Sequence, residues 1–246
     1  MRYAQSILEL LSQLCLDGYG RSDLCLARDA YVLAMRAFTG LVRPSGKLFI
    51  DHAVGTASVL HVVGAPRAIT CAGLIHSIYA YGEMGRWRKG VSKASRRKVE
   101  AVVGVEVEEL VAGYTALRWN RATISAIATK VKTYDAVGRG AVLMRLANEV
   151  DEHLDGGVLY LPDAERRRDA DTLLLPSLVT MAEELGYPIL ASELARVFEE
   201  TMSSTTPDWV PDGSMRAVSL QVPMSCRRSL RCLLAGVSAG RLRRQS

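Results

Sequence analysis

The chain has few aromatic side chains and no uninterrupted apolar run long enough to span a membrane. Aromatic residues make up 6% of its 246 residues, and hydrophobic residues make up 49%. A core of this composition consists mainly of Leu, Val and Ala, which suits packed helices better than a β-sandwich. Polar residues interrupt every apolar stretch before about 18 residues, the length that a membrane-spanning helix requires. The composition therefore predicts an all-α protein that has no membrane partner.

Cysteine is also scarce, and its spacing argues against two kinds of site. The five cysteines, an odd number, include no C-x-x-C pair. This pattern favours neither a disulfide framework nor a zinc site of the Cys-rich type. Residues 1–5 lack the layout of a secretory signal peptide. A reduced, cytoplasmic location is therefore expected.

The net charge of +5 is the compositional feature that suggests nucleic-acid binding. The basic residues, however, are spread over residues 86–89, residues 96–98 and the C-terminal tail, while acidic residues gather at 106–109 and 149–155. Proteins that bind a duplex more often show one dense basic face and a recognisable docking motif. The sequence contains no such motif, so nucleic acid is not expected as a partner. The basic segments are interpreted as solvated surface.

Apolar residues recur every three or four positions along most of the chain, which is typical of amphipathic helices. The segment 67–79 is almost wholly apolar and is predicted to be the central buried helix. Asp23 or Ser22 is expected to cap the start of the second helix. The pattern predicts a bundle of roughly 8–11 helices. Helical segments are expected at about residues 7–18, 22–38, 51–63, 67–79, 95–102, 107–114, 121–135, 142–154, 164–184 and 192–202.

The helical periodicity stops near residue 203. Residues 203–207 and 211–213 are rich in Ser, Thr, Pro and Gly, which is typical of a linker. Residues 215–222 fit an extended segment, and the residues that follow are rich in Arg and Ser. We therefore expect a helical domain at 1–202, followed by a linker and an irregular, basic C-terminal tail at 203–246. The tail is interpreted as disordered rather than as a membrane-binding helix.

The histidines are the residues best suited to carry chemistry, because the sequence contains no phosphate-binding P-loop. His52 begins one predicted helix, and His76 lies at the end of the buried helix. A buried imidazole without a hydrogen-bond partner costs about 1–3 kcal/mol, so both rings require polar neighbours. The spacing alone leaves two interpretations open. The rings are either satisfied core residues or parts of a functional site shared by adjacent helices.

Short motifs surround both histidines. Residues 43–46 read R-P-S-G and lead to His52, while residues 72–76 read A-G-L-I-H. Residues 111–117 read V-A-G-Y-T-A-L, and residues 144–149 read M-R-L-A-N-E. In order and spacing, this series resembles the hydrolase domain of RelA/SpoT-type stringent-response enzymes, a branch of the HD-domain superfamily. That domain carries an R-x-S-G loop, a His-Asp doublet, and V-D-G-V-T-K-L and K-L-A-D-R segments. The resemblance covers about residues 28–200 and implies an HD-like helical bundle.

The metal site that the resemblance implies is altered in this chain. HD hydrolases hold a divalent ion with two His and two Asp. Hard cations such as Mn²⁺ and Mg²⁺ depend on such oxygen anions, and here two of them are replaced by neutral groups. No metal or other cofactor is therefore expected, and an ion that did bind would use the two histidines. The positions that match the four ligands are His52, His76, Ser77 and Asn148. The His-Ser doublet also resembles an uncharacterised set of HD-like domains, which brings no known reaction.

The resemblance also identifies candidate site residues. The acidic Glu-Asp pair that serves pyrophosphate hydrolysis in the family matches Ala80 and Tyr81, so ordinary ppGpp hydrolysis is not expected. The remaining imidazole, hydroxyl, amide and carboxyl groups still offer acid–base chemistry. The catalytic residues predicted are His52, His76, Ser77, Tyr79, Tyr81, Asn148 and Glu152. In the family, the Arg of the R-x-S-G loop stacks on a purine base, and further cations can contact phosphate. The substrate-binding residues predicted are Arg43, Ser45, Lys47 and Arg145.

Three functions are open at this level. The first is a divergent HD-fold enzyme that acts on a small, phosphorylated or nucleotide-like substrate by His-centred acid–base chemistry; the retained histidines favour it. The second is a catalytically inactive HD-like regulator that binds a nucleotide or another metabolite; the loss of both aspartates favours it. The third is a helical scaffold that contacts a partner through its basic tail. The sequence also leaves the formation of a homo-oligomer open.

Overall fold

The computed structural model describes residues 2–82, 90–160 and 164–205. These residues form an all-α fold, with one isolated β-bridge between Val42 and Leu48 and no strand. No helix among them combines the length and the apolar character that crossing a membrane would require. The fold class predicted from the sequence is thus confirmed. The elements are α1 (Ile7–Leu16), α2 (Arg21–Phe38), α3 (Phe49–Val62), α4 (Arg67–Gly73), α5 (Ile78–Tyr81), α6 (Lys93–Ala116), α7 (Arg121–Lys130), η1 (Val131–Thr133), α8 (Ala136–Leu154), η2 (Gly157–Tyr160), α9 (Ala164–Glu184) and α10 (Pro188–Ser203), where η marks a 3₁₀ helix.

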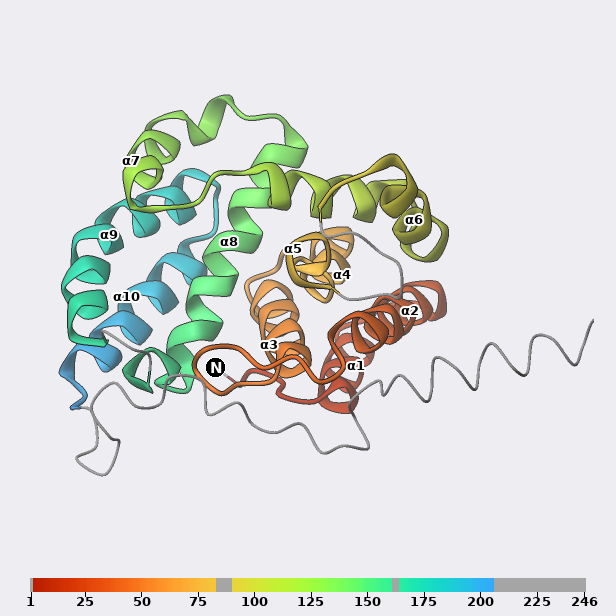
Figure 1. Ribbon diagram of the computed structural model, residues 1–246, viewed down its shortest axis with the longest axis horizontal. Helices are drawn as coiled ribbons and strands as arrows, with labels where there is room; N and C mark the ends of the chain where they lie inside the picture. Colours follow the sequence, from red (N-terminus) through yellow and green to blue (C-terminus); the bar gives the residue numbers. More distant parts are fainter. Residues whose placement is uncertain (1, 83–89, 161–163, 206–246) are drawn as a thin grey trace, which may run out of the picture.

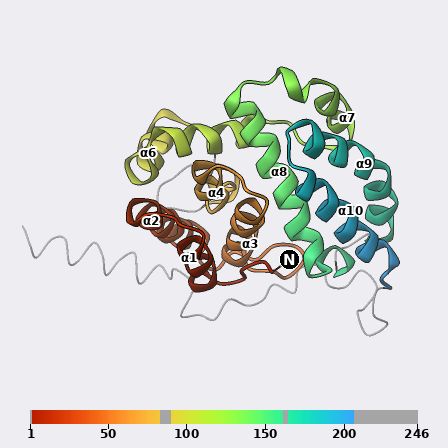
Figure 2. The same cartoon turned by 180° about the vertical axis from the view of Figure 1, so that it is seen from behind.

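Helix α8 runs through the middle of the bundle. Figures 1 and 2 show α9 and α10 on one side of it and α3 on the other. It also packs against α6. The helix is capped by Asp135, whose carboxylate accepts a hydrogen bond from the Gly138 N–H at 2.7 Å. Because most of its surface is buried, the polar side chains of α8 need partners inside the protein.

The segment 67–79 is largely buried, but the prediction of one continuous helix was wrong. Helix α4 ends at Gly73, and α5 begins only at Ile78. Tight turns lie between them, in which the Ile75 N–H donates to the Ala72 carbonyl and the Ile78 N–H to the Ile75 carbonyl. An apolar run has the same composition whether it forms a helix or such turns, so the pattern did not reveal the break.

Several other boundaries differ from the predicted ones. Helices α8 and α10 begin at Ala136 and Pro188, before the predicted residues 142 and 192, and the segment 121–135 is divided between α7 and η1. The helices expected at 95–102 and 107–114 form the single helix α6, which is kinked at Gly104, where φ is 80°. Helix α2 is capped by Gly20 rather than by Asp23 or Ser22. Asp23 instead accepts a hydrogen bond from the Gly20 N–H at 3.2 Å, which is the half of a capping box that a glycine cap allows.

The structure describes only the first residues of the linker and tail that were predicted to begin at residue 203. Helix α10 ends at Ser203. The extended segment expected at 215–222 and the basic tail lie outside the described residues. The domain division at 202 therefore stays a prediction.

Helix α4 approaches α3 closely at Gly73. A Cβ atom there would lie 2.7 Å from Leu60 Cδ1 and 3.1 Å from the Ala57 Cα. Gly73→Ala is expected to lower the free energy of unfolding by about 1–3 kcal/mol, because the backbone of α3 has to move. Urea denaturation measures this change as a lower midpoint at an unchanged m-value. A midpoint equal to that of the natural chain would contradict the close packing.

Candidate functional site

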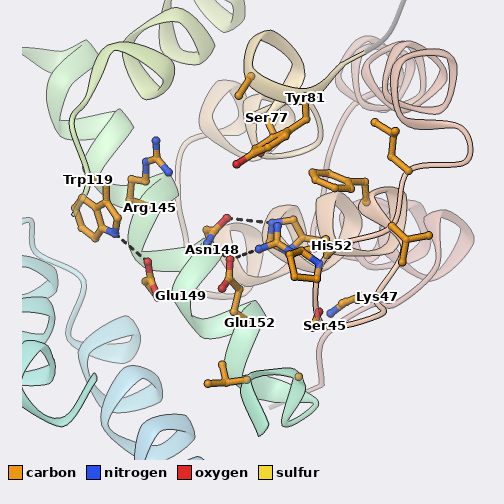
Figure 3. A pocket seen from close by; sticks show the side chains of 18 of the residues that line it. Ser45, Lys47, His52, Ser77, Tyr81, Trp119, Arg145, Asn148, Glu149 and Glu152 are labelled. Carbon is orange, nitrogen blue, oxygen red and sulfur yellow. Dashed lines mark hydrogen bonds and ion pairs between the residues drawn. The ribbon is translucent and has the colours of Figure 1, made fainter. Parts of the chain in front are cut away.

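A cavity of about 700 Å³ lies between the loop 39–48 and helix α8 (Figure 3). Side chains from α3, from the α5 region and from the end of α6 complete its wall. Nine of the eleven predicted site residues line it. They are Arg43, Ser45, Lys47, His52, Ser77, Tyr81, Arg145, Asn148 and Glu152. The fold thus brings together segments that lie far apart in the sequence.

His52 is held in the first turn of α3 by a buried carboxylate. Its Nδ1 donates a hydrogen bond to Asp151 Oδ2 at 2.6 Å, and its Nε2 lies 3.0 Å from Asn148 Oδ1. Asp151 is fully buried and also accepts hydrogen bonds from Lys47 Nζ, which lies 3.0 Å from each of its oxygens. Burial raises the pKa of Asp151, and the Lys47 ammonium counteracts this. A carboxylate that accepts from both partners keeps the ring proton of His52 on Nδ1.

Asp151 reaches His52 because α3 has no side chain at residue 55. A Cβ atom on Gly55 would lie 1.8 Å from Asp151 Oδ1. Any larger residue at this position would therefore displace the carboxylate. Gly55 is a part of the site that contributes space rather than a functional group.

His76 lies behind His52 and does not line the cavity. The two ring centroids are 5.0 Å apart in an edge-to-face arrangement, and the Tyr114 ring is also 5.0 Å from His76. Nδ1 of His76 donates to the Gly73 carbonyl at 2.7 Å. Its Nε2 is buried, and none of the described residues hydrogen-bonds to it. The two imidazoles converge, but only His52 reaches the cavity.

Both imidazoles are neutral at neutral pH. Burial, followed by the positive charge of Arg43, lowers the pKa of His52 to about 3. Burial and the neighbouring His52 hold the pKa of His76 well below its ordinary value. Neutral imidazoles present a lone pair, which can accept a proton or coordinate a metal ion.

The residues at this place do not fit the divalent ion that the resemblance implies. The candidate ligand atoms are Nε2 of His52, the buried Nε2 of His76 and Oδ1 of Asn148, and none of them carries a negative charge. Across the described part of the chain, no group of three or more His, Cys, Asp or Glu side chains is arranged to hold a metal ion. Mn²⁺ and Mg²⁺ require carboxylate or other hard oxygen ligands.

Two carboxyl groups of α8 in the cavity wall differ in protonation. Glu152 pairs with the Arg43 guanidinium and accepts a hydrogen bond from Asn148 Nδ2 at 2.9 Å. Burial alone would raise its pKa, but Arg43 and the other neighbours hold it below the ordinary value. Glu149 accepts from the Trp119 indole N–H at 2.8 Å. Burial, followed by the charge of Glu152, raises the pKa of Glu149 to about 8. One carboxyl is therefore protonated and the other ionised at neutral pH.

Tyr79 lies outside the cavity, whereas Tyr81 lines it. The Tyr79 hydroxyl donates to Glu108 at 2.5 Å, and Glu108 is also paired with Arg96. Tyr81 packs on Phe49, with ring centroids 5.1 Å apart. Residues two positions apart in this short helix thus face different surroundings, and Tyr79 joins α5 to α6.

Glu149 and Trp119 line the cavity but were not among the predicted site residues. Glu149 ends the M-R-L-A-N-E segment at 144–149, whereas no motif marks Trp119. The sequence signal for Glu149 was its spacing from Arg145, because residues four apart share a face of a helix. Trp119 follows the end of α6, and its contact with α8 depends on the tertiary fold.

A family model described as a domain of unknown function, DUF6817, matches residues 33–118. No curated protein matches the chain. The matched segment contains the loop, His52 and Ser77, but the residues of α8 lie outside it. The match covers less than half of the chain and names no activity. The resemblance to HD domains therefore stays a prediction.

Metal content should respond to restored carboxylates. The natural chain is expected to hold little or no tightly bound Mn²⁺ after dialysis. Ser77→Asp combined with Asn148→Asp should raise the affinity for Mn²⁺ at least about tenfold, because both replacements add an oxygen anion. Elemental analysis and calorimetric titration measure the two properties. Stoichiometric Mn²⁺ in the natural chain would show that the neutral ligand set suffices.

Stability should fall as the pH decreases. The pKa of His52, about 3, lies below the ordinary 6.5, so between these pH values the unfolded chain binds a proton that the folded chain does not. The free energy of unfolding should therefore decrease by about 1.4 kcal/mol per pH unit for such a histidine as the pH drops. His52→Gln should remove this part of the slope in urea denaturation between pH 6 and 4.

His153→Gln is the matched comparison for the pH experiment. Burial lowers the pKa of His153 to about 4, and its ring packs on Phe198 away from the cavity. The His153→Gln variant should also reduce the dependence of the free energy of unfolding on pH. If neither variant changes the slope, the histidines are not the groups that couple stability to pH.

Proposed function

We propose that this chain is a divergent HD-fold enzyme that acts on a small, phosphorylated or nucleotide-like substrate by acid–base chemistry centred on His52. The observation that carries the proposal is that His52 lies in the wall of the cavity and is held from behind by the buried carboxylate of Asp151. The carboxylate keeps the ring proton on Nδ1, so Nε2 is the basic atom; it faces the Asn148 amide oxygen at 3.0 Å, an acceptor that stabilises a proton taken up by Nε2. An imidazole held in this way can accept a proton from a substrate or an attacking water.

Acid–base chemistry also needs a proton donor, and Glu149 is the group proposed for that role. Its pKa of about 8 keeps it protonated at neutral pH, while the lowered pKa of Glu152 keeps that side chain ionised. Carboxyl groups whose environments push their pKa values apart are a recurring source of acid and base pairs. The proposed chemistry thereby relies less on His76, which lies behind the cavity wall.

Ordinary ppGpp hydrolysis is not part of the proposal. Ala80 and Tyr81 line the cavity at the positions where the resemblance places the acidic pair of the family, and neither carries a carboxylate. Arg43 is paired with Glu152, and its guanidinium lies 5.6 Å from the centre of the Phe49 ring. A purine base would have to share Arg43 with these groups. Base stacking by Arg43 therefore stays a prediction.

A catalytically inactive regulator that binds a nucleotide or metabolite is the second candidate. The pKa of His52, about 3, favours it, because so weak a base takes up protons poorly at neutral pH. Both candidates share a small-molecule ligand, a cytoplasmic location and the absence of a nucleic-acid partner. A homo-oligomer is compatible with either candidate.

His52→Gln separates the two candidates. Glutamine retains hydrogen bonding but transfers no proton, so turnover of an accepted substrate should fall by about 10²–10⁴-fold. The rise in melting temperature caused by the same ligand should persist, because binding to the folded chain alone raises stability. Phosphorus NMR of a panel of nucleotides and phosphorylated metabolites measures turnover, and a thermal-shift assay measures binding.

Arg139→Gln is the control for this experiment, because Arg139 is an exposed cation on the same helix. It should change neither turnover nor binding. Binding by the natural chain without turnover of any compound would support the regulator. Turnover by His52→Gln at the natural rate would place the chemistry elsewhere.

A further inference from the structure

The cations at the loop end of the cavity are already neutralised by the protein. Arg43 pairs with Glu152, and Lys47 pairs with Asp151 at 3.0 Å and with Asp155 at 3.2 Å. The Lys47 side chain is 12% exposed. These ion pairs fasten the loop 39–48 to α8. Neither side chain is free to bind a ligand without giving up a carboxylate.

Arg145, at the other end of the cavity, has a different environment. Figure 3 shows it beside Trp119, on the side of Asn148 away from Lys47. Its Nη2 donates to the Tyr114 carbonyl at 3.2 Å, and its Cζ lies 3.7 Å from the centre of the Tyr114 ring. Its Nε is buried and has no hydrogen-bond partner among the residues that the structure describes.

The expected partner of Arg145 on α8 does not pair with it. Glu149 follows Arg145 by four residues, a spacing at which side chains on a helix commonly form ion pairs. Glu149 instead accepts the hydrogen bond of the Trp119 indole at 2.8 Å. Among the side chains that the structure describes in residues 2–82, 90–160 and 168–205, no carboxylate forms an ion pair with Arg145. Arg145 is therefore the lining cation that lacks a counter-ion in this part of the chain.

A guanidinium that is partly removed from water gains most from an anion that replaces the lost hydration. Its planar fork of N–H donors matches the geometry of a carboxylate or a phosphate. The stacked Tyr114 ring keeps the plane of the guanidinium in place through a cation–π contact. The Nε–H of Arg145, which has no partner among the described residues, thus belongs to a guanidinium whose orientation is already fixed.

We propose that Arg145, stacked on Tyr114 and neighboured by Trp119, forms a subsite for a single oxyanion, a phosphate or a carboxylate group, of the ligand that the cavity binds. The proposal rests on the proposed function for the choice of this cavity as the ligand site. It narrows the ligand class to molecules with one anionic group, because Arg43 and Lys47 are committed to protein carboxylates.

The Trp119 indole N–H provides a direct probe of this subsite. Its proton–nitrogen NMR signal, assigned with Trp119→Phe, should shift in a saturable way when inorganic phosphate is added to the full chain. Arg145→Gln should weaken the affinity for phosphate at least about tenfold, as expected for the loss of a charge-assisted contact. The control Arg139→Gln removes an equal charge from the exposed side of α8 and should leave the affinity unchanged.

Arg145→Lys covers the case in which Arg145→Gln does not fold. Lysine keeps the charge but lacks the planar fork, so the affinity should fall between those of the natural chain and the Gln variant. A titration with acetate identifies the oxyanion: a response to both anions indicates that carboxylates are accepted, and a response to phosphate alone indicates a phosphoryl group. The absence of a saturable shift, or equal affinities in the natural chain and both Arg145 variants, would overturn the subsite.

Pyrophosphate tests the limit to one anionic group. It should bind no more than about threefold more tightly than phosphate, because a second oxyanion finds no unpaired cation. A gain of about tenfold or more would contradict that limit. None of these titrations measures turnover. If the chain binds phosphate through Arg145 but catalyses no reaction, the enzyme proposal is wrong and the subsite proposal stands. If the chain is an active enzyme whose affinity for phosphate does not depend on Arg145, the subsite proposal is wrong and the enzyme proposal stands.

Discussion

The fold and the candidate site depend on the same buried carboxylate, that of Asp151. A carboxylate without exposed surface is tolerated only when nearby charges and hydrogen bonds compensate for its lost hydration. Its partners come from separate segments, Lys47 from the loop 39–48 and His52 from α3. The contacts that hold these segments against α8 therefore also set the tautomer of the imidazole in the cavity. Removing this carboxylate would alter architecture and chemistry together.

The helices could largely be predicted from the spacing of apolar residues, because most of them bury one face and expose another. The predicted segment 164–184 coincides with α9. Helices α8 and α10 begin before the predicted residues, and the pattern missed the break after α4 and the kink in α6, where the backbone interrupts the helix. The turns at 74–77 bury apolar side chains as a helix would, and the kink at Gly104 depends on a positive φ. Neither feature changes the apolar periodicity.

The candidate site was predicted in part, because its motifs lie in short segments that converge in space. Residues near His52 and Asn148 could be placed together from the resemblance. The side-chain direction of Tyr79 could not, since it depends on the break before α5. The protonation of Glu149 and His52 could not be predicted either. Their pKa values result mainly from burial, which is a property of the packed tertiary structure.

The absence of a side chain at Gly55 on α3 couples this position to Asp151, which is distant in the sequence. The volume that a side chain at Gly55 would occupy is filled by the Asp151 carboxylate. In any related sequence, a bulkier residue at position 55 would therefore have to be accompanied by a smaller one at position 151. Residues 55 and 151 are therefore expected to vary together. Inspecting residue 55 alone would indicate whether a relative has kept the acid that orients the imidazole.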